Sequence, residues 1–307
     1  MAETYPNWVN LTLTDVRKWV SDTLVSFESM LPKLYTMGTS DKQEEYDVTY
    51  SGLGKFKLVT GTVGKDSMAE EHKTTYTFAE WMNELDVQRR LYDDKQDRQV
   101  MILSRELALS AKRSRESHGA EPFNNAFTAT GTFSDGTSTA HADGKALCAT
   151  NHSSKANAGY AGVNKGTTVI SPASVMSARD MMRNFTDGRG NKQYCELDML
   201  LGPAHKDFEE VAWEIINTTG KVDVADNNRN FHQGRYKLAL WGELTNSKNH
   251  FYIDSSKMSL YLHWLDRIAL EFYDSYTPNP PMFTYGGYMR YGFNANNWRW
   301  IVGHEVA

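Results

Sequence analysis

The segment at residues 45–81 constrains the fold most, because its sequence predicts two paired strands with too few apolar residues to form a hydrophobic core between them. Tyr46, Val48 and Tyr50 alternate with polar residues, and Tyr76 and Phe78 interleave with threonines, which is the period of a β-strand. Each strand therefore carries only a thin apolar stripe. An isolated two-stranded ribbon is marginal in water, and its edges invite pairing with another chain. We expect a neighbour to hold this ribbon down.

The stretch GTVGKDS, residues 61–67, lies near the far end of the predicted ribbon and resembles a phosphate-binding loop. Such a loop needs a glycine five residues before its Gly-Lys pair and a hydroxyl directly after the lysine. Val59 and Asp66 stand at these positions, and the acid would repel phosphates. We therefore interpret the glycines as turn residues and expect Lys65 and Asp66 to face water or another subunit.

Composition describes an ordinary soluble protein. Of the 307 residues, 40% are hydrophobic and 23% are charged, and the net charge is −5. A negative balance argues against gripping nucleic acid as the main task, because phosphate binding depends on lysine and arginine. The N-terminal MAETYPNWVN predicts no signal peptide, no apolar run approaches a membrane span, and synthesis in a reducing cytoplasm is expected. Cys148 and Cys195 fit no metal-ligand spacing and are expected to be free thiols.

Two amphipathic helices are predicted in the first part of the chain. The first covers residues 14–31, ends before Pro32 and must dock its apolar face on something. The second covers residues 98–117, with Gly119 as its expected stop. Its last turns carry Lys112, Arg113 and Arg115, where cations favour the helix dipole. A nucleic-acid patch is the alternative interpretation of this basic cluster.

Residues 119–168 are rich in small and polar residues and predict a long loop. His141, Asp143 and His152 lie within it. A metal needs a closed set of ligands at suitable spacing, so we interpret these three as ordinary polar loop residues, with a metal site as the alternative.

The second half of the chain predicts alternating helices and strands. Helices are expected at 171–184 and 205–219, strands at 197–202, 236–244, 250–254 and 267–275, and a turn at 187–191. The last segment holds Tyr288, Tyr291, Trp298 and Trp300, which could stack on sugars or bases. The same composition is typical of half-buried strands and protein interfaces, and we favour that interpretation.

No catalytic motif is present: the chain lacks the nucleophile elbow, the H-E-x-x-H zinc signature and the dinucleotide-binding glycine pattern. Adjacent glutamates at 44–45, 70–71 and 209–210 point in different directions on a strand or helix. We therefore predict no enzyme activity, no catalytic residue, no cofactor and no metal.

Four segments in order resemble the tailed-bacteriophage major capsid proteins of the Hong Kong 97 fold, most closely the Mu-like major head subunit. They are FNNAFTATGTFSDGTSTAHADGKALCATNH (123–152), SPASVMSARDMMRNFTDGRGN (171–191), LDMLLGPAHKDFEEVAWEIINT (197–218) and DNN (226–228). Cys148 and Ser153 depart from the family, which has Phe and Pro there.

The resemblance implies an α+β chain of the Hong Kong 97 type with defined parts. Residues 1–40 would be an N-terminal arm, and residues 41–92 an extended β-hairpin loop that overlaps an adjacent subunit. Residues 93–159 would form a peripheral domain with a long spine helix, and 160–255 an axial domain. Residues 256–307 would add the closing strands of the peripheral domain.

The implied function is structural. Copies of the chain would assemble as pentamers and hexamers into an icosahedral virion shell that encloses double-stranded DNA and touches it weakly. Portal, scaffold and decoration proteins would be further partners, synthesis would take place in the host cytoplasm, and no membrane is involved. The residues expected at contacts between subunits are Trp19, Phe27, Lys55, Lys57, Lys65, Asp66, Glu70 and Glu71.

Two alternatives remain open at this point. Within the same fold, an encapsulin-like compartment would package cargo enzymes instead of DNA. In a different class, a carbohydrate- or nucleic-acid-binding module would use the surface around Trp298 and Trp300. An enzyme has no supporting motif.

Overall fold

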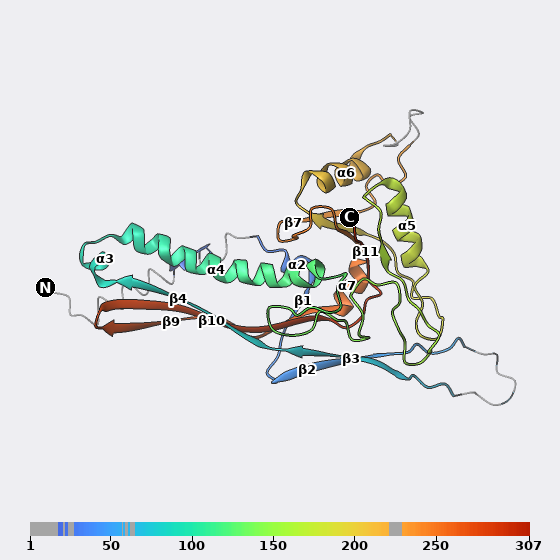
Figure 1. The fold of residues 1–307 in the computed structure, drawn as a ribbon, viewed down its shortest axis with the longest axis horizontal. Coiled ribbons are helices and arrows are strands. Elements are labelled where there is room, and N and C mark those ends of the chain that lie inside the picture. The colour runs from blue at the N-terminus through green and yellow to red at the C-terminus, as the bar shows by residue number, and fades with distance from the viewer. Residues whose placement is uncertain are drawn as a thin grey trace.

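The computed structural model describes residues 18–20, 22–23, 28–56, 58, 61, 65–220 and 229–307. A long helix and a long sheet extend to one side, and a second sheet with two helices rises at the other end (Figure 1). A thin two-stranded ribbon runs beneath this second part and beyond it (Figure 1). The molecule is therefore elongated, with two packed regions and one projection.

The elongated region packs helix α4 (Asp97–Asn124) along a four-stranded sheet of order β1-β9-β10-β4. These strands are β1 (Thr36–Thr39), β4 (Ala79–Gln88), β9 (Leu262–Pro278) and β10 (Pro281–Ala295). Helix α3 (Arg89–Asp93) joins β4 to α4. A small core of Val87, Val100, Leu107 and Phe283 fills the space between helix and sheet. Burial of these side chains holds the long elements together.

The second region is built on a five-stranded sheet of order β5-β11-β8-β6-β7. Its strands are β5 (Lys165–Gly166), β6 (Met199–Pro203), β7 (Lys237–Trp241), β8 (His250–Ile253) and β11 (Ile301–His304). Helices α5 (Pro172–Arg183) and α6 (Lys206–Asn217) cover it, and α7 (Ser255–Tyr261) leads into β9. Ser171 caps α5 with a reciprocal bond to Ser174, which sets its start.

One continuous apolar core joins the end of α4 to the five-stranded sheet. Phe123 of α4 meets Trp241, Phe251 and Trp300 edge to face, with ring centroids 5.5–6.2 Å apart. Edge-to-face aromatic pairs of this kind add about 0.5–1.5 kcal/mol each beyond their buried area. The long helix therefore forms a rigid connection between the two regions.

The predicted ribbon is confirmed. Strand β2 (Glu44–Tyr50) pairs antiparallel with β3 (Glu70–Thr77), from Glu44 opposite Thr77 to Tyr50 opposite Glu70. After Phe78 the chain continues as β4, which leaves the ribbon and pairs with β10. We call residues 44–77 the projection.

Gly119 is not the helix stop that we expected, because α4 continues through it and through Pro122 to Asn124. A Cβ at position 119 would lie 2.1 Å from Cδ2 of Leu31 and 3.5 Å from the ring of Trp241. Gly119 therefore permits α4 to pack closely against Leu31. This packing joins residues far apart in the sequence, so a local sequence rule does not predict it.

The first predicted helix is also corrected. Residues 18–20 and 22–23 are helical, but residues 28–30 are not, and Pro32 lies in the first turn of the short helix α2 (Leu31–Leu34). Proline suits a first turn because its missing N–H needs no partner there. The carboxylate of Glu116 accepts hydrogen bonds from the hydroxyl of Ser29 and, at 3.2 Å, from the backbone N–H of Met30. Glu116 thus stabilises the non-helical backbone at Ser29 and Met30.

The remaining elements agree with the sequence prediction more closely. Each expected helix and strand of the second half is present with its ends within five residues of those predicted, and among the described residues β5 and α7 were not anticipated. Tyr291, Trp298 and Trp300 are buried, so the alternative that they form an exposed stacking surface is wrong. Across the described ranges, no helix has the length and apolarity needed to cross a membrane.

The sheets do not follow the predicted domain boundaries at two points. Strand β4 belongs to the range 41–92 but pairs with β10, and β11 belongs to 256–307 but joins the five-stranded sheet. The division into arm, extended loop, peripheral domain and axial domain stays a prediction.

We predict that Gly119→Ala destabilises the protein by about 1–2 kcal/mol, because overpacking of a buried site outweighs the gain in helix propensity of about 1 kcal/mol. The control is the same substitution combined with Leu31→Ala, which makes room for the new methyl group. In that background Gly119→Ala should be neutral or stabilising. Denaturant unfolding of the wild type, the two single variants and the double variant measures the effect of Gly119→Ala with and without Leu31. A Gly119→Ala single variant that is more stable than the wild type would contradict the packing argument.

Candidate functional site

The projection carries large apolar side chains that the rest of its own chain leaves uncovered. Phe56 is fully exposed, and Leu58 is 88% exposed. The other large exposed apolar side chains of this region are Tyr46, Tyr50, Leu53 and Met68. Burying a side chain of this size is worth about 1.5–3 kcal/mol, and groups of exposed apolar residues mark interaction sites. The projection is therefore the candidate functional site, and its tip is the part that would be covered.

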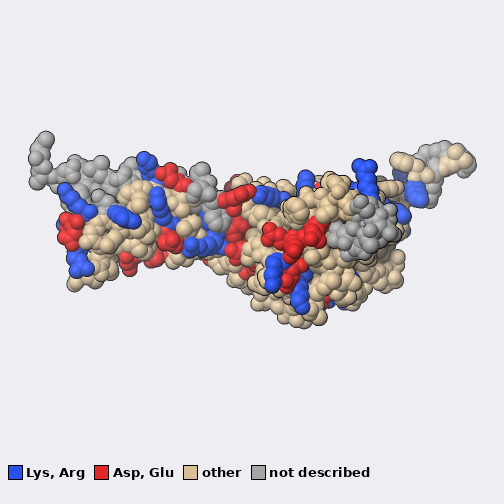
Figure 2. All heavy atoms as spheres, turned by 90° about the horizontal axis from the view of Figure 1, so that it is seen from above, with Lys and Arg blue, Asp and Glu red and all other residues tan. Residues whose placement is uncertain are grey.

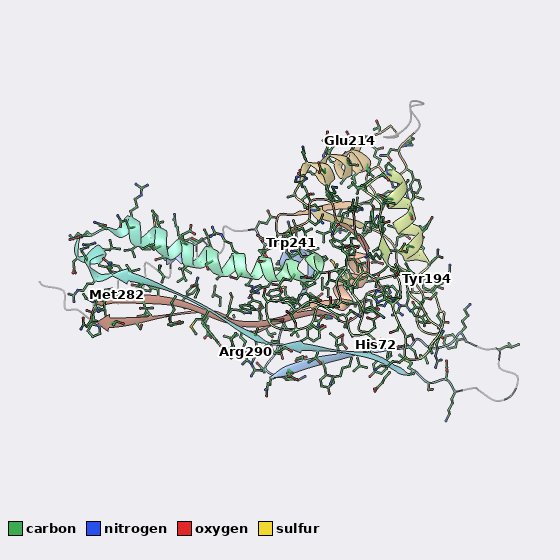
Figure 3. The ribbon with its side chains drawn as sticks, viewed as in Figure 1. His72, Tyr194, Glu214, Trp241, Met282 and Arg290 are labelled. Carbon is green, nitrogen blue, oxygen red and sulfur yellow. The ribbon has the colours of Figure 1, made fainter. Side chains whose placement is uncertain are left out.

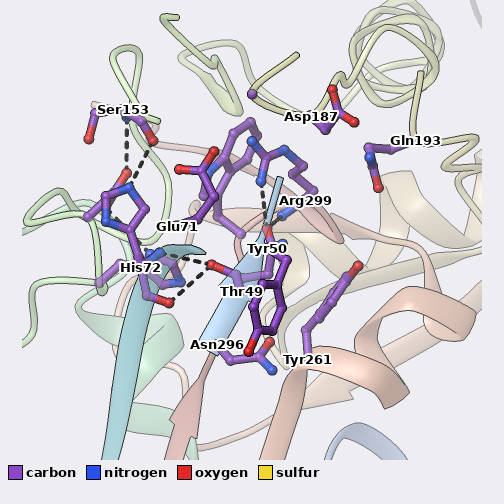
Figure 4. A pocket seen from close by; sticks show the side chains of 15 residues that line it. Thr49, Tyr50, Glu71, His72, Ser153, Asp187, Gln193, Tyr261, Asn296 and Arg299 are labelled. Atoms are coloured by element: carbon purple, nitrogen blue, oxygen red, sulfur yellow. Dashed lines mark hydrogen bonds and ion pairs between the residues drawn. The ribbon is translucent and has the colours of Figure 1, made fainter. Parts of the chain in front are cut away.

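Polar contacts fix the base of the projection to its own chain (Figure 4). One carboxylate oxygen of Glu71 accepts a hydrogen bond from the Ser154 hydroxyl at 2.6 Å, and the other accepts one from the Lys155 backbone N–H at 2.6 Å. Nε2 of His72 lies 3.2 Å from the carbonyl oxygen of Ser153. Strand β3 is thereby tied to loop 153–155.

A second set of contacts holds the chain beyond the strands. The guanidinium of Arg189 donates to the Asp66 carboxylate at 2.8 Å and 2.9 Å and to the carbonyl oxygen of Ser67 at 2.5 Å. Hydrogen bonds from Arg189 and from the Gly54 N–H lower the pKa of Asp66 to about 2. Asn191 donates to the Leu53 carbonyl at 3.0 Å. The turn at residues 187–191, which the sequence predicted, is therefore a docking point for the projection.

The loop that receives Glu71 is itself held by a buried histidine. Nδ1 of His152 lies 2.6 Å from Oδ2 of Asp143, Nε2 lies 3.1 Å from Oδ1 of Asn164, and the ring stacks on Trp298 at 4.2 Å. Burial alone would raise the pKa of Asp143, but hydrogen bonds from His141 and His152 outweigh it and lower the pKa. Because Asn164 directs its amide N–H groups to two backbone carbonyls, both ring nitrogens of His152 face acceptors. Burial lowers the pKa of His152, and the hydrogen bond to the Asp143 carboxylate only partly offsets that effect.

These residues bring the loop histidines together without making a metal centre. His141 Nδ1 lies 3.4 Å from Asp143 Oδ1. Among the residues that the structure places, no group of three or more His, Cys, Asp or Glu side chains could hold a metal ion. Cys148 and Cys195 are both free and buried, as predicted. Burial raises the pKa of the Cys195 thiol to about 11, so that thiol is unreactive at neutral pH.

A small cavity of about 70 Å³ lies between the projection and this loop. Glu71, His72, His141 and Arg299 are among the residues that line it (Figure 4). Pockets for small-molecule ligands are usually about 300–1,000 Å³. The cavity has room for ordered water but not for a substrate of ordinary size.

The eight residues predicted at subunit contacts have different surroundings. Trp19 packs on the small core beside α4, while Phe27 and Lys57 lie outside the described residues. Lys55, Lys65 and Glu70 are exposed. Asp66 and Glu71 have partners in their own chain, which the sequence did not predict. A contact of any of the eight with another subunit stays a prediction.

Phe56 and Leu58 are the contact candidates that the sequence prediction missed. The alternation of these two residues with Lys55 and Lys57 was visible in the sequence, although β2 ends before them at Tyr50. The exposed apolar side chains are the stronger candidates, because their exposure to water is costly.

Comparison with known proteins identifies the fold. No family model and no curated protein sequence matches the chain. Solved structures do match: a virus-like particle from Pyrococcus furiosus has 10% identity and a TM-score of 0.54, covering 95% of this chain and 98% of that chain. The capsid of an empty GTA (gene-transfer-agent) particle has 12% identity and a TM-score of 0.56, covering 92% and 91%.

A third structure, the capsid of cyanophage P-SCSP1u, has 9% identity and a TM-score of 0.55, covering 91% of this chain and 88% of that chain. Such low identity with such broad coverage shows a shared fold. The chain therefore has the α+β capsid fold of the Hong Kong 97 type, as the resemblance predicted. Kinship with the Mu-like head subunits in particular stays a prediction.

We predict that Glu71→Gln lowers the free energy of unfolding by about 1–3 kcal/mol, because one amide N–H₂ would replace an oxygen that accepts a buried hydrogen bond. Glu70→Gln is the matched control, since Glu70 is the neighbouring residue and is exposed. Thermal unfolding compares the two variants. Equal stability of both variants would show that Glu71 does not anchor the projection.

We predict that Arg189→Gln releases the tip and speeds cleavage within residues 51–69 several-fold in limited proteolysis. Lys192→Gln, a neutralised cation in the same exposed segment, is the control and should cleave at the wild-type rate.

The difference in cleavage rate between wild type and Arg189→Gln should persist at acidic pH. The pKa of Asp66 is lowered from 3.8 to about 2, so the contact stabilises the attached state above about pH 4 and is lost only as the pH falls through about 2. Pepsin at pH 3 should therefore still distinguish wild type from Arg189→Gln. Identical cleavage at both neutral pH and pH 3 would contradict the attachment.

Proposed function

We propose that this protein is the structural major capsid protein of a tailed phage, and that copies of it assemble as pentamers and hexamers into an icosahedral shell around double-stranded DNA. The observation that carries the proposal is the shared fold, which extends over more than nine-tenths of the chain in capsid structures. The exposed apolar tip of the projection supports it independently.

A surface that fits the tip exists on the same chain. Asn83 of β4 donates to Ser110 of α4 at 2.9 Å, so the odd-numbered residues of β4 face the helix and the even-numbered ones face away. The outward row holds Glu80, Glu84 and Asp86, together with Met82, which is 63% exposed. Glu80 pairs with Arg290 of β10 at 3.6 Å on this open side of the four-stranded sheet, so Glu84 and Asp86 supply most of its negative charge around the apolar Met82.

The neighbouring strands continue this open face. Met82 lies opposite Tyr288 of β10, and Tyr288 lies opposite Glu271 of β9. The tip of the projection carries Lys55 and Lys65 beside its exposed apolar side chains. Its charge and apolarity therefore complement the open sheet face, which supports a contact between the tip of one copy and the sheet of the next.

Such a contact joins two different surfaces of identical chains. Heterologous contacts produce rings when the rotation closes, and closed rings of five and six are the units that the proposal requires. The anchored base gives every copy the same projection direction, while the tip can adjust to its neighbour. In this proposal residues 41–92 act as the extended loop and residues 160–255 as the axial domain.

The remaining parts of the proposal follow from a structural role. A net charge of −5 suits a wall that encloses DNA without gripping it. The protein would act without catalysis, in the virion, after synthesis in the host cytoplasm. Portal, scaffold and decoration proteins would be its other partners, and kinship with the Mu-like head subunits belongs to the same proposal.

Electron microscopy of the purified protein and of a tip variant tests the proposal. Wild-type protein should form large hollow particles, and Phe56→Ser/Leu58→Ser should lose them while its subunit melts within about 1 °C of wild type, because exposed substitutions rarely change stability by more than about 0.5 kcal/mol. Phe56→Leu/Leu58→Met is the control that keeps the tip apolar, and it should assemble.

A wild-type protein that stays near its chain mass of 34.9 kDa would contradict the proposal. So would normal particles from the double serine variant. Particles filled with cargo enzymes instead of DNA would favour the encapsulin-like compartment.

A further inference from the structure

Helix α6 presents an exposed tryptophan among acids. Its buried side packs Phe208, Ala212, Ile215 and Ile216 on the sheet, while Trp213 is 57% exposed on the other side. A shallow hollow beside Trp213 is lined by Lys206, Glu209, Glu210 and Glu214. Acidic side chains gather over this region in Figure 2, and Glu214 points outward in Figure 3. We call Glu209, Glu210, Trp213 and Glu214 the acidic face.

A second exposed aromatic residue of the same region lies among arginines. Phe231 is 46% exposed, and the guanidinium of Arg235 lies 3.9 Å from its ring centroid. The guanidinium of Arg179, from α5, lies 5.5 Å from the same ring. Arg183, one turn further along α5, donates to Glu196 at 2.8 Å, as Arg179 does. The side chain of Arg179 is only 11% exposed and pairs with Glu196, so Arg235 supplies the accessible positive charge. We call Arg179, Phe231 and Arg235 the basic face.

The two faces share one rigid support, and the loop that carries Phe231 and Arg235 is tied to the last turn of α6, where the Gly234 N–H donates to the Ile216 carbonyl at 2.9 Å. Tyr252 of β8 lies 2.8 Å from Ser174 of α5, and a Cβ on Gly202 of β6 would touch the ring of Phe208 of α6. The register pairs Leu200 with Tyr252, so Gly202, two residues further, points to the same side as Tyr252. Helices α5 and α6 therefore cover one sheet face, α5 over β8 and α6 over β6, and Figure 1 shows them at its two flanks.

We propose that the acidic face of one copy packs against the basic face of the next copy around a ring, with Trp213 and Phe231 inside the contact. This inference rests on the proposed function and names the partner surface of the axial region. Exposed aromatic and arginine residues are the types that dominate binding energy at protein interfaces. Carboxylates and guanidinium groups add charge-assisted hydrogen bonds and fix the register.

Charge also selects the kind of contact. Two acidic faces brought together in a two-fold dimer would place at least six carboxylates side by side, since each holds Glu209, Glu210 and Glu214. Like charges across an interface cost several kcal/mol. Charge therefore disfavours a symmetric pair of acidic faces and favours a contact between unlike faces, which closes rings when it is head-to-tail.

Charge reversal tests this pairing in the full-length protein. Glu209→Arg/Glu210→Arg and, separately, Arg235→Glu should each reduce the yield of closed particles at least ten-fold. The chain that carries all three substitutions should recover to within about three-fold of wild type, because the cations introduced at positions 209 and 210 would then meet the carboxylate introduced at position 235. Glu243→Arg, an exposed acid in the turn after β7, is the control and should assemble normally.

Circular dichroism of dissociated subunits distinguishes a variant that fails to fold from one that folds but fails to assemble. The variant Glu209→Gln/Glu210→Gln removes the two negative charges while keeping the size of the side chains, and it tests the same contact more mildly. Normal particle yield from both single-face reversals would overturn the inference, and so would a triple variant with no recovery. Both outcomes leave the proposed function standing if wild type assembles and Phe56→Ser/Leu58→Ser does not. Failure of wild type itself to form particles would instead overturn the proposed function.

Discussion

The hydrogen bonds of Glu71 are the interaction on which the rest of the structure depends. A ribbon with a thin apolar stripe cannot fix its own direction, and Glu71 supplies that direction by bonding to Ser154 and Lys155. The loop behind them holds its shape because His152 is fixed between Asp143 and Asn164 and stacked on Trp298. These contacts lie at the base of the projection, so the rigidity that they provide is local to that base.

The projection divides two tasks between two kinds of interaction. Polar contacts within the chain aim it, and the apolar side chains at its tip, above all Phe56 and Leu58, remain for another surface. The proposed contacts of the open sheet face and of the two charged faces beside the five-stranded sheet extend the same logic. In the proposal each contact joins unlike surfaces, so each is head-to-tail by charge. Together they describe a subunit whose rigid core presents complementary edges to its copies.

Local patterns predicted the elements well, and tertiary contacts account for what they missed. Alternation from Tyr46 to Phe78 predicted the ribbon, and the three-to-four residue period predicted α4, α5 and α6. Gly119 and Pro32 were misinterpreted because local rules treat them as stops, whereas Leu31 and Glu116 decide their roles from far along the chain. The pairing of Asp66 with Arg189 spans 123 residues, and no local period reports such a contact. Burial of Trp298 and Trp300 likewise involves distant residues, because His152 stacks on Trp298 and Phe123 of α4 meets Trp300 edge to face.

Photocrosslinking from position 56 tests the central claim most directly. Each subunit carries a photoreactive amino acid in place of Phe56, and particles are assembled from an equal mixture of isotopically light and heavy subunits. Mass spectrometry then distinguishes crosslinks within a chain from crosslinks between chains, because only the latter can join light and heavy peptides. The account predicts mixed-isotope crosslinks that join position 56 of one copy to residues 80–86 of another. Crosslinks confined to a single chain, or crosslinks between copies that avoid the open sheet face, would contradict it.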